Sequence, residues 1–161
     1  MIDKKRTVCF TGHRDIPENR VEILEKLLDK AIEQLYGEGV IFYGGGGSYR
    51  FDALAEKAVL RARERHSDIA LILVLPCKDQ DKYWNAEMKA EYAEIVSKAD
   101  KVVYTSESYS KGCMHKRNRH LVEYSEYCVA YLTKNSGGTA YTVDYAIKNG
   151  LRIVNLGEYF K

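Results

Sequence analysis

The chain has 161 residues, the ordinary length of one domain, and it is long enough to bury a hydrophobic core without disulfides or metals. It is 45% hydrophobic and 30% charged, and no apolar run approaches the roughly 20 residues that cross a membrane, which excludes a membrane protein. The formal net charge of +2 is far from the basic excess of a dedicated nucleic-acid binder. Composition therefore argues against nucleic acid as a partner, and any anion site must be local.

The N-terminal sequence passes from charged residues directly into a predicted strand, which leaves no room for the apolar core of a secretory signal. We therefore expect one cytoplasmic domain covering residues 1–161, and self-association into a homo-oligomer stays open. The cysteines Cys9, Cys77, Cys113 and Cys128 show no C-x-x-C spacing. We expect buried free thiols instead of a zinc or redox motif, and we predict neither a bound metal nor a cofactor.

Short β-branched or aromatic runs alternate with amphipathic stretches along the whole chain, a pattern typical of βαβ units. The predicted strands are 7–11, 40–43, 69–75, 101–105, 127–132 and 152–156. The predicted helices begin near Pro17, after the glycine run 44–47, near Trp84, at Arg117 and at Gly138. The third strand is apolar without alternation, which predicts a central strand covered on both faces. The pattern therefore indicates an α/β fold, a Rossmann-like three-layer sandwich with a mostly parallel sheet of about six strands.

Three glycine-containing turns, at 11–14, 44–47 and 136–139, each follow a predicted strand. Ligands of open parallel sheets bind at the carboxyl ends of the strands, where such turns meet. Glycine lets the backbone approach a phosphate, and free N–H groups at a helix N-terminus attract an anion. One such turn can equally serve a positive φ, whereas three together favour a phosphate site. The candidate ligand-binding residues in these turns are Gly12, Gly45, Gly46, Gly137, Gly138 and Thr139.

Polar side chains near the same turns extend the predicted site. Arg14 and Arg117 are positioned to grip a phosphate, and Asn118 to orient a base or sugar, although 114–120 also fits a solvated basic helix end. Asp52 can accept ribose hydroxyls, although an acidic residue in a first helical turn is favourable by itself. His13 serves either the ligand or a loop hydrogen bond. Neither the Gly-x-Gly-x-x-Gly fingerprint nor a Walker A Lys-Ser/Thr pair is present.

The order of these motifs resembles a known family. It comprises 9–14 (CFTGHR), the glycine run before Phe51-Asp52, Leu75-Pro76 with Gln80 and Trp84, Met114-x-x-Arg117-Asn118, and 137–142 (GGTAYT). The chain is similar to SLOG-superfamily proteins of the YpsA-like, DUF1273 group. The resemblance implies a Rossmann-like fold and a nucleotide-related pocket. The wider superfamily includes cytokinin-activating phosphoribohydrolases, the DNA-processing protein DprA and sensors of nucleotide-derived signals, so the fold does not fix the function.

In the phosphoribohydrolases, a glycine-rich segment binds phosphate and carries a catalytic glutamate, which works with the arginine of a Met-x-x-Arg-Lys segment. By this resemblance Arg117 matches the arginine, Asn118 stands where lysine is usual, and Thr142 occupies the glutamate position. A threonine hydroxyl cannot replace a carboxylate acid or base at neutral pH. The resemblance therefore leaves that hydrolytic mechanism without its catalytic group.

Three functions are compatible with these observations. The first is the binding or sensing of a nucleotide or nucleotide derivative, related to ADP-ribose or NAD by analogy. The alternative is a nucleoside-monophosphate phosphoribohydrolase-like enzyme in which Asp52 or His13 replaces the missing glutamate. The third, DprA-like binding of single-stranded DNA, needs a basic track that the charge balance argues against. Whether the protein is an enzyme stays open, and no catalytic residue is assigned.

Overall fold

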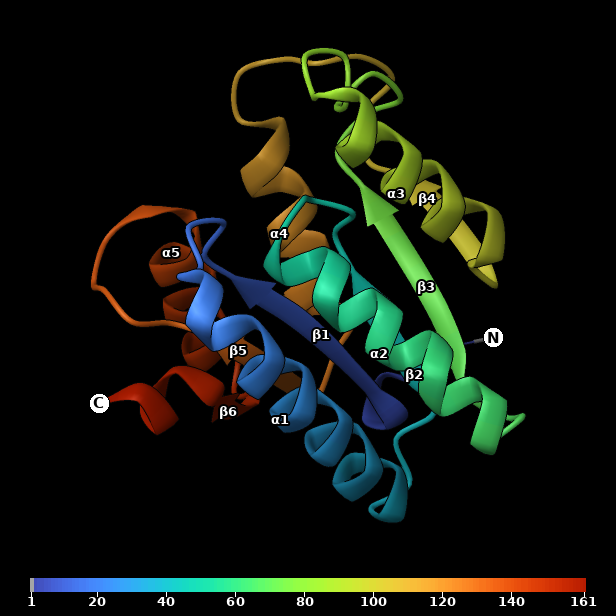
Figure 1. The fold of residues 1–161 in the computed structure, drawn as a ribbon, viewed down its shortest axis with the longest axis vertical. Coiled ribbons are helices and arrows are strands. Elements are labelled where there is room, and N and C mark those ends of the chain that lie inside the picture. The colour runs from blue at the N-terminus through green and yellow to red at the C-terminus, as the bar shows by residue number, and fades with distance from the viewer. Residues whose placement is uncertain (1) are drawn as a thin grey trace.

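The computed structural model of the chain describes residues 2–161, which form one six-stranded parallel sheet with the order β4-β3-β2-β1-β5-β6 (Figure 1). The strands are β1 (Thr7–Gly12), β2 (Phe42–Gly45), β3 (Ala70–Leu75), β4 (Lys101–Tyr104), β5 (Tyr127–Tyr131) and β6 (Arg152–Asn155). The helices are α1 (Glu18–Gly37), α2 (Phe51–Arg65), α3 (Ala86–Lys98), α4 (Cys113–Glu123) and α5 (Gly137–Lys148), with short 3-10 turns η1 (Lys4–Arg6) and η2 (Leu156–Phe160). The predicted Rossmann-like α/β fold is confirmed.

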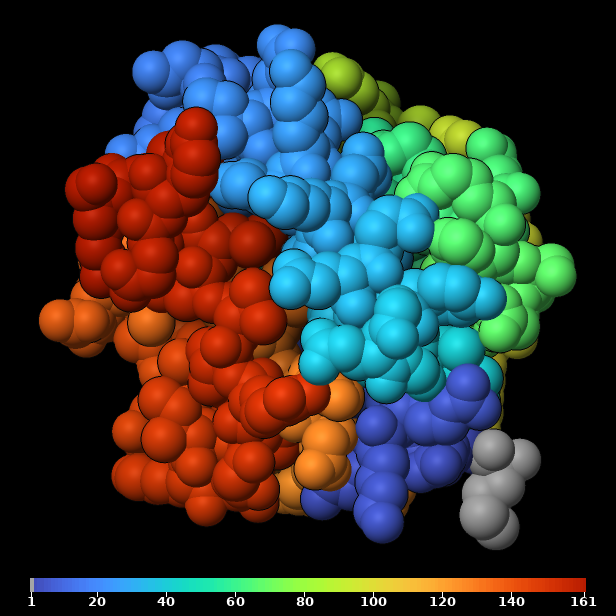
Figure 2. Space-filling view, turned by 90° about the horizontal axis from the view of Figure 1, so that it is seen from below, coloured from blue at the N-terminus to red at the C-terminus, as the bar shows by residue number. Residues whose placement is uncertain are grey.

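The sheet divides the core into two clusters because successive strand residues point to opposite faces. Phe10, Leu73 and Val129 pack under α1, α2 and α3, whereas Cys9 and Cys128 belong to the cluster beneath α4 and α5. In Figure 1 the first group of helices lies in front of the sheet and the second behind it. Figure 2 shows the C-terminal segment lying beside α1, where the Arg20 guanidinium stacks 4.6 Å from the centre of the Phe160 ring.

The predicted position of the third strand is wrong, and so are the bounds of several other predicted elements. The third predicted strand, β3, is not central: it lies second from the β4 edge, and β1 and β2 occupy the middle of the sheet. Its uniform apolarity reflects burial on both faces, which a strand beside the edge strand can share. Gly44 and Gly45 belong to strand β2 and not to the turn after it. The helix predicted at Arg117 begins one turn earlier, at Cys113, and Trp84 precedes α3, which Asn85 caps.

All four cysteines are buried and free, as expected from their spacing. Cys9 and Cys128 are register partners on neighbouring strands, and Cys113 is the first residue of α4. Burial raises the pKa of the Cys77 thiol to about 11. A thiol that stays protonated is a weak nucleophile, so Cys77 contributes packing and not reactivity.

Gly12 provides a test of packing at the end of β1. A Cβ there would overlap the Phe51 side chain, including Cβ of Phe51 at 2.8 Å. We expect Gly12→Ala to lower the free energy of unfolding by about 1–3 kcal/mol, because the buried Phe51 ring cannot retreat. Gly37→Ala is the control, since a Cβ at Gly37 meets nothing within 4 Å, and it should raise stability by about 0.5–1 kcal/mol. Equal urea midpoints for the two variants would contradict this account.

Candidate functional site

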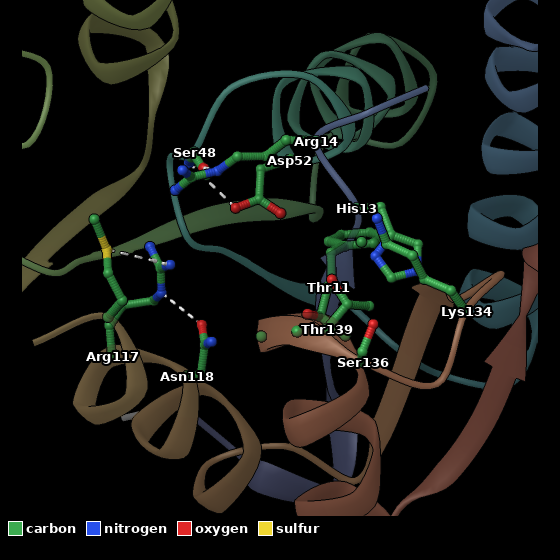
Figure 3. Close-up of a pocket in the computed structure, with 15 residues that line it drawn as sticks. Thr11, His13, Arg14, Ser48, Asp52, Arg117, Asn118, Lys134, Ser136 and Thr139 are labelled. Atoms are coloured by element: carbon green, nitrogen blue, oxygen red, sulfur yellow. Dashed lines mark hydrogen bonds between the residues drawn. The ribbon is translucent and has the colours of Figure 1, made fainter. Parts of the chain in front are cut away.

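A cavity of about 360 Å³ opens at the carboxyl edge of the sheet (Figure 3). It lies where the chain changes direction: β2, β3 and β4 extend from one side of β1, and β5 and β6 from the other. The loops after β1 and β5 therefore lead to helices on opposite faces, which leaves a crevice between them. The walls come from these two loops, the segment after β2, and the first turns of α2, α4 and α5.

The structure brings nine of the eleven predicted ligand-binding residues to this cavity. These nine are Gly12, His13, Arg14, Asp52, Arg117, Asn118, Gly137, Gly138 and Thr139. Six further lining residues were not among the predicted ligand-binding residues, and these are Phe10, Thr11, Ser48, Met114, Lys134 and Ser136. Thr11 and Ser136 belong to glycine turns that the sequence singled out, and Lys134 precedes one of them, so their position along the chain was the available signal. Within residues 2–161, Gly45 and Gly46 are the two predicted residues that do not line the cavity.

Gly45 and Gly46 lie outside the cavity lining, and each is closely approached by charged side chains of the protein. A Cβ on Gly46 would lie 2.8 Å from Nη1 of Arg117 and 3.0 Å from Oδ2 of Asp52. A Cβ on Gly45 would lie 2.7 Å from Cγ of Glu56. The missing side chains therefore make room for charged side chains of the protein itself, and the predicted contact of these two glycines with a ligand stays a prediction.

Arg117 is the buried cation of the site. It is only 5% exposed, and its Nη1 donates to the carbonyl oxygen of Gly46. Its Nε donates to Oδ1 of Asn118 over 2.7 Å, and Nη2 contacts the sulfur of Met114. In Figure 3 the Arg117 and Asn118 side chains rise from α4 toward the cavity. The guanidinium is thereby fixed in place before any ligand arrives.

Two buried carboxyl groups face Arg117 from α2. Asp52 accepts a hydrogen bond from the backbone N–H of Ser48 (3.1 Å), and Glu56 accepts one from that of Gly47 (2.9 Å). Burial raises the pKa of Asp52 against the opposing charge of Arg117. Burial and the neighbouring Asp52 raise the pKa of Glu56 well above its usual range. Sequence reasoning missed Glu56, although an acidic residue one turn after Asp52 on the apolar face of a helix was a usable signal.

His13 joins the two loops that border the crevice. The backbone N–H of Thr133 donates to its Nε2 over 3.1 Å, so this nitrogen carries a lone pair and the ring is neutral. Burial and the charge of Lys134 lower the pKa of His13, although Asp15 opposes the shift. Of the two predicted roles, the structure shows the loop hydrogen bond, and the ring also lines the cavity.

Positive charge and free backbone donors surround the opening. Nε of Arg14 donates to Oγ of Ser48 over 2.8 Å, and the guanidinium stacks on Tyr49 at 4.6 Å. Across residues 2–161, no carboxylate lies within 4.0 Å of the Arg14 side-chain nitrogens. Helix α5 begins at Gly137, where φ is +88°, and the Ser136 side chain makes no capping hydrogen bond within the described residues. The site thus presents two guanidinium groups and an uncapped helix N-terminus to one space.

Thr142, which the resemblance to the phosphoribohydrolases places at the position of their glutamate, does not supply a reacting group. Its side chain is buried, and Oγ1 donates to the carbonyl oxygen of Gly138 over 2.8 Å. Asp52, on the opposite wall, supplies the carboxylate of the lining (Figure 3). The site therefore has an acid, but it approaches from another direction.

The parallel sheet, the helices on both faces and the cavity at the change of strand order together define a Rossmann-like α/β protein. The chain belongs to the YspA SLOG family, whose model matches residues 9–153. It is 28% identical over 143 residues to the uncharacterized SPbeta prophage-derived protein YoqJ of Bacillus subtilis, covering 81% of this chain and 84% of YoqJ. It is 24% identical to the UPF0398 protein BH1768 of Halalkalibacterium halodurans, covering 80% of this chain and 69% of that protein.

Among solved structures, the chain is similar to DNA processing protein A (DprA) of Streptococcus pneumoniae and of Helicobacter pylori, each with a TM-score of 0.67 and 17% identity over 93% of this chain. These likenesses concern the fold. The chain spans about half of the pneumococcal protein (50%) and 64% of the Helicobacter protein. In residues 2–161 there is no helix with the length and apolarity needed to cross a membrane.

The raised pKa of Glu56 makes stability depend on pH. The unfolded chain loses this proton near pH 4.5 while the folded chain keeps it, so stability should fall as pH rises above that value, until the folded-state pKa is passed. The decline from one such group is at most about 1.4 kcal/mol per pH unit. We expect Glu56→Gln, which mimics the protonated acid, to flatten the decline in urea unfolding between pH 5 and 8. Parallel curves for the two proteins would show that Glu56 ionises normally.

Proposed function

We propose that the chain binds the phosphate group of a nucleotide or nucleotide derivative in this cavity. One observation carries the proposal: Arg14, the buried Arg117 and the uncapped start of α5 all face the same space. Helix N-termini and guanidinium groups are the two devices that most often bind phosphate in proteins. The oxygens of a phosphate can accept from both at once.

The charge of the lining supports an anion over a neutral ligand. Lys134 pairs with Asp15 outside the cavity (2.9 Å), and Asp52 offsets part of the Arg117 charge. Arg14 forms no ion pair with a carboxylate among residues 2–161, and it lines the same cavity as the first residues of α5. This local excess of positive charge would attract phosphate even though the net charge of the chain is only +2.

The size of the cavity supports a small molecule. A volume of about 360 Å³ falls within the range of about 300–1,000 Å³ that is typical of small-molecule sites. Asn118 and Asp52 provide amide and carboxyl groups suited to a sugar or base. The analogy with nucleotide-sensing members of the superfamily adds ADP-ribose or NAD as ligands to test.

Gly138 gives a direct test, because a side chain there enters the cavity without disturbing the fold. Its surroundings are open to 4 Å, and its φ is not in the left-handed region. We expect Gly138→Val to lower affinity for AMP, ADP-ribose and NAD at least tenfold, about 1.4 kcal/mol, in calorimetry. Gly37→Val, at another open helical glycine, should leave affinity unchanged. Unchanged binding in the Gly138 variant would refute a phosphate at the start of α5.

A second candidate function is hydrolysis of a nucleoside monophosphate, and Asp52 is the observation that favours it. A carboxyl group whose pKa is raised by burial, lining a cavity beside an arginine, has the properties of a general acid. Water would add at C1′ of the ribose as the glycosidic bond to the base breaks, with the acid protonating the departing base.

The enzyme hypothesis is tested by release of free base from AMP, followed by chromatography. We expect Asp52→Asn to reduce release at least 100-fold, as is typical for loss of a general acid, while the variant still binds AMP. Activity that survives both Asp52→Asn and Arg117→Ala would place the chemistry elsewhere. No release from the unaltered protein, together with measurable AMP binding, would leave the binding function and exclude this one.

A further inference from the structure

A second cavity, of about 400 Å³, lies on another face of the first turns of α4. Its polar lining comes from the loop before α4, from α4 itself and from α5, and includes Ser106, Ser110, Lys111, Lys116, Arg119 and Tyr141. Lys116, Arg119 and a further lining residue, His115, come from the basic segment 114–120, yet they do not line the first cavity. The first cavity therefore accounts for only part of that segment.

The second cavity carries positive charge without a matching negative charge. No acidic residue is part of its described lining. Within residues 2–161, Lys111, Lys116 and Arg119 have no carboxylate within 4.0 Å, whereas many other basic side chains are paired. Lys111 and Lys116 are exposed, so an entering anion can reach both. Three unpaired cations around one hollow repel each other, and an anion between them removes that repulsion.

An aromatic pair lines the second cavity. His115 meets Tyr141 edge to face, with ring centres 4.4 Å apart, and Nη1 of Arg119 donates to the Tyr141 hydroxyl over 3.3 Å. This hydrogen bond holds the Arg119 guanidinium at the edge of the cavity. Tyr141 is 40% exposed, so part of its surface is accessible to a ligand.

The two cavities are neighbours on the same two helices. Asn118 on α4 and Gly138 on α5 line the first cavity, and His115 and Tyr141, each three residues away, line the second. Three residues of helix correspond to a rise of about 4.5 Å, and a helix is about 10 Å across. A single nucleotide-sized molecule can therefore reach from one cavity to the other.

We infer that the ligand carries at least two phosphate groups, one held in each cavity. This inference rests on the proposed binding of a first phosphate by Arg14, Arg117 and the start of α5. The second phosphate lies among Lys111, Lys116 and Arg119, and the sugar lies between the two phosphates, near His115 and Tyr141. The ligand class is a nucleoside bisphosphate, because its sugar separates the two phosphate groups, whereas the two phosphates of a pyrophosphate share one oxygen and stay together.

The inference is tested by calorimetry with AMP, adenosine 3′,5′-bisphosphate, ADP-ribose and the oligonucleotide dT10. The unaltered protein should bind adenosine 3′,5′-bisphosphate at least about tenfold more tightly than AMP, whereas ADP-ribose, whose two phosphates are adjacent, should not share this gain. The variant Lys111→Ala/Lys116→Ala should lose most of this preference, while its affinity for AMP changes less than about twofold. Both lysines are exposed, and their side chains make no hydrogen bond among the described residues, so the fold should persist. Arg119→Ala is the second variant, with the same expectation.

A matched control removes the same charge elsewhere. Lys30→Ala/Lys89→Ala alters two exposed lysines on α1 and α3 and should keep the preference. Equal affinities for AMP and adenosine 3′,5′-bisphosphate, or a preference that survives in the Lys111/Lys116 variant, would overturn the second site but not the first. Tighter binding of dT10 than of every small probe would overturn the small-ligand assignment in favour of a nucleic-acid strand. Failure of all probes, AMP included, would overturn the proposed function itself.

Discussion

The burial of Arg117 between Asp52 and Glu56 is the interaction on which the rest of the site depends. A buried guanidinium is tolerable only with opposite charges and hydrogen-bond acceptors close by, and breaking such a cluster typically costs several kcal/mol. Its members come from α2 and α4, which cover opposite faces of the sheet, so the cluster ties the two layers together at the carboxyl edge. The three side chains can approach each other closely because Gly45 and Gly46, which lie next to them, have no side chains of their own.

The same cluster sets the electrostatics that a ligand meets. Burial raises the pKa values of Asp52 and Glu56, and the neighbouring Asp52 adds to the rise for Glu56, while the charge of Arg117 opposes both shifts. When one of the two carboxyl groups keeps its proton, less negative charge lies beside Arg117. The positive charge of Arg117 then acts more strongly in the cavity. An arriving phosphate adds negative charge near the same carboxyl groups and so favours their protonation further. The proposed phosphate binding would therefore be coupled to proton uptake.

The sequence predicted most of the fold and much of the site, because both follow from local order. Parallel strands place their carboxyl ends at one edge, so residues such as Gly12 and Gly138, far apart in the chain, had to converge. Strand order is not local: the apolar run of β3 reports burial on two faces and not a central position. A glycine in the sequence is ambiguous as well, because it can make room either for a ligand phosphate or for a side chain of the protein. At Gly45 it makes room for the side chain of Glu56.

Thr142 shows that the first turn of α5 is complete without a carboxylate at this position. The hydroxyl donates to the carbonyl oxygen of Gly138, so it stabilises that turn. Asp52 supplies the carboxyl group of the lining from across the cavity, where the charge of Arg117 partly compensates its loss of solvation. The proposed phosphate binding and the alternative hydrolysis therefore draw on opposite walls, because α5 provides the backbone donors and α2 provides the carboxyl group.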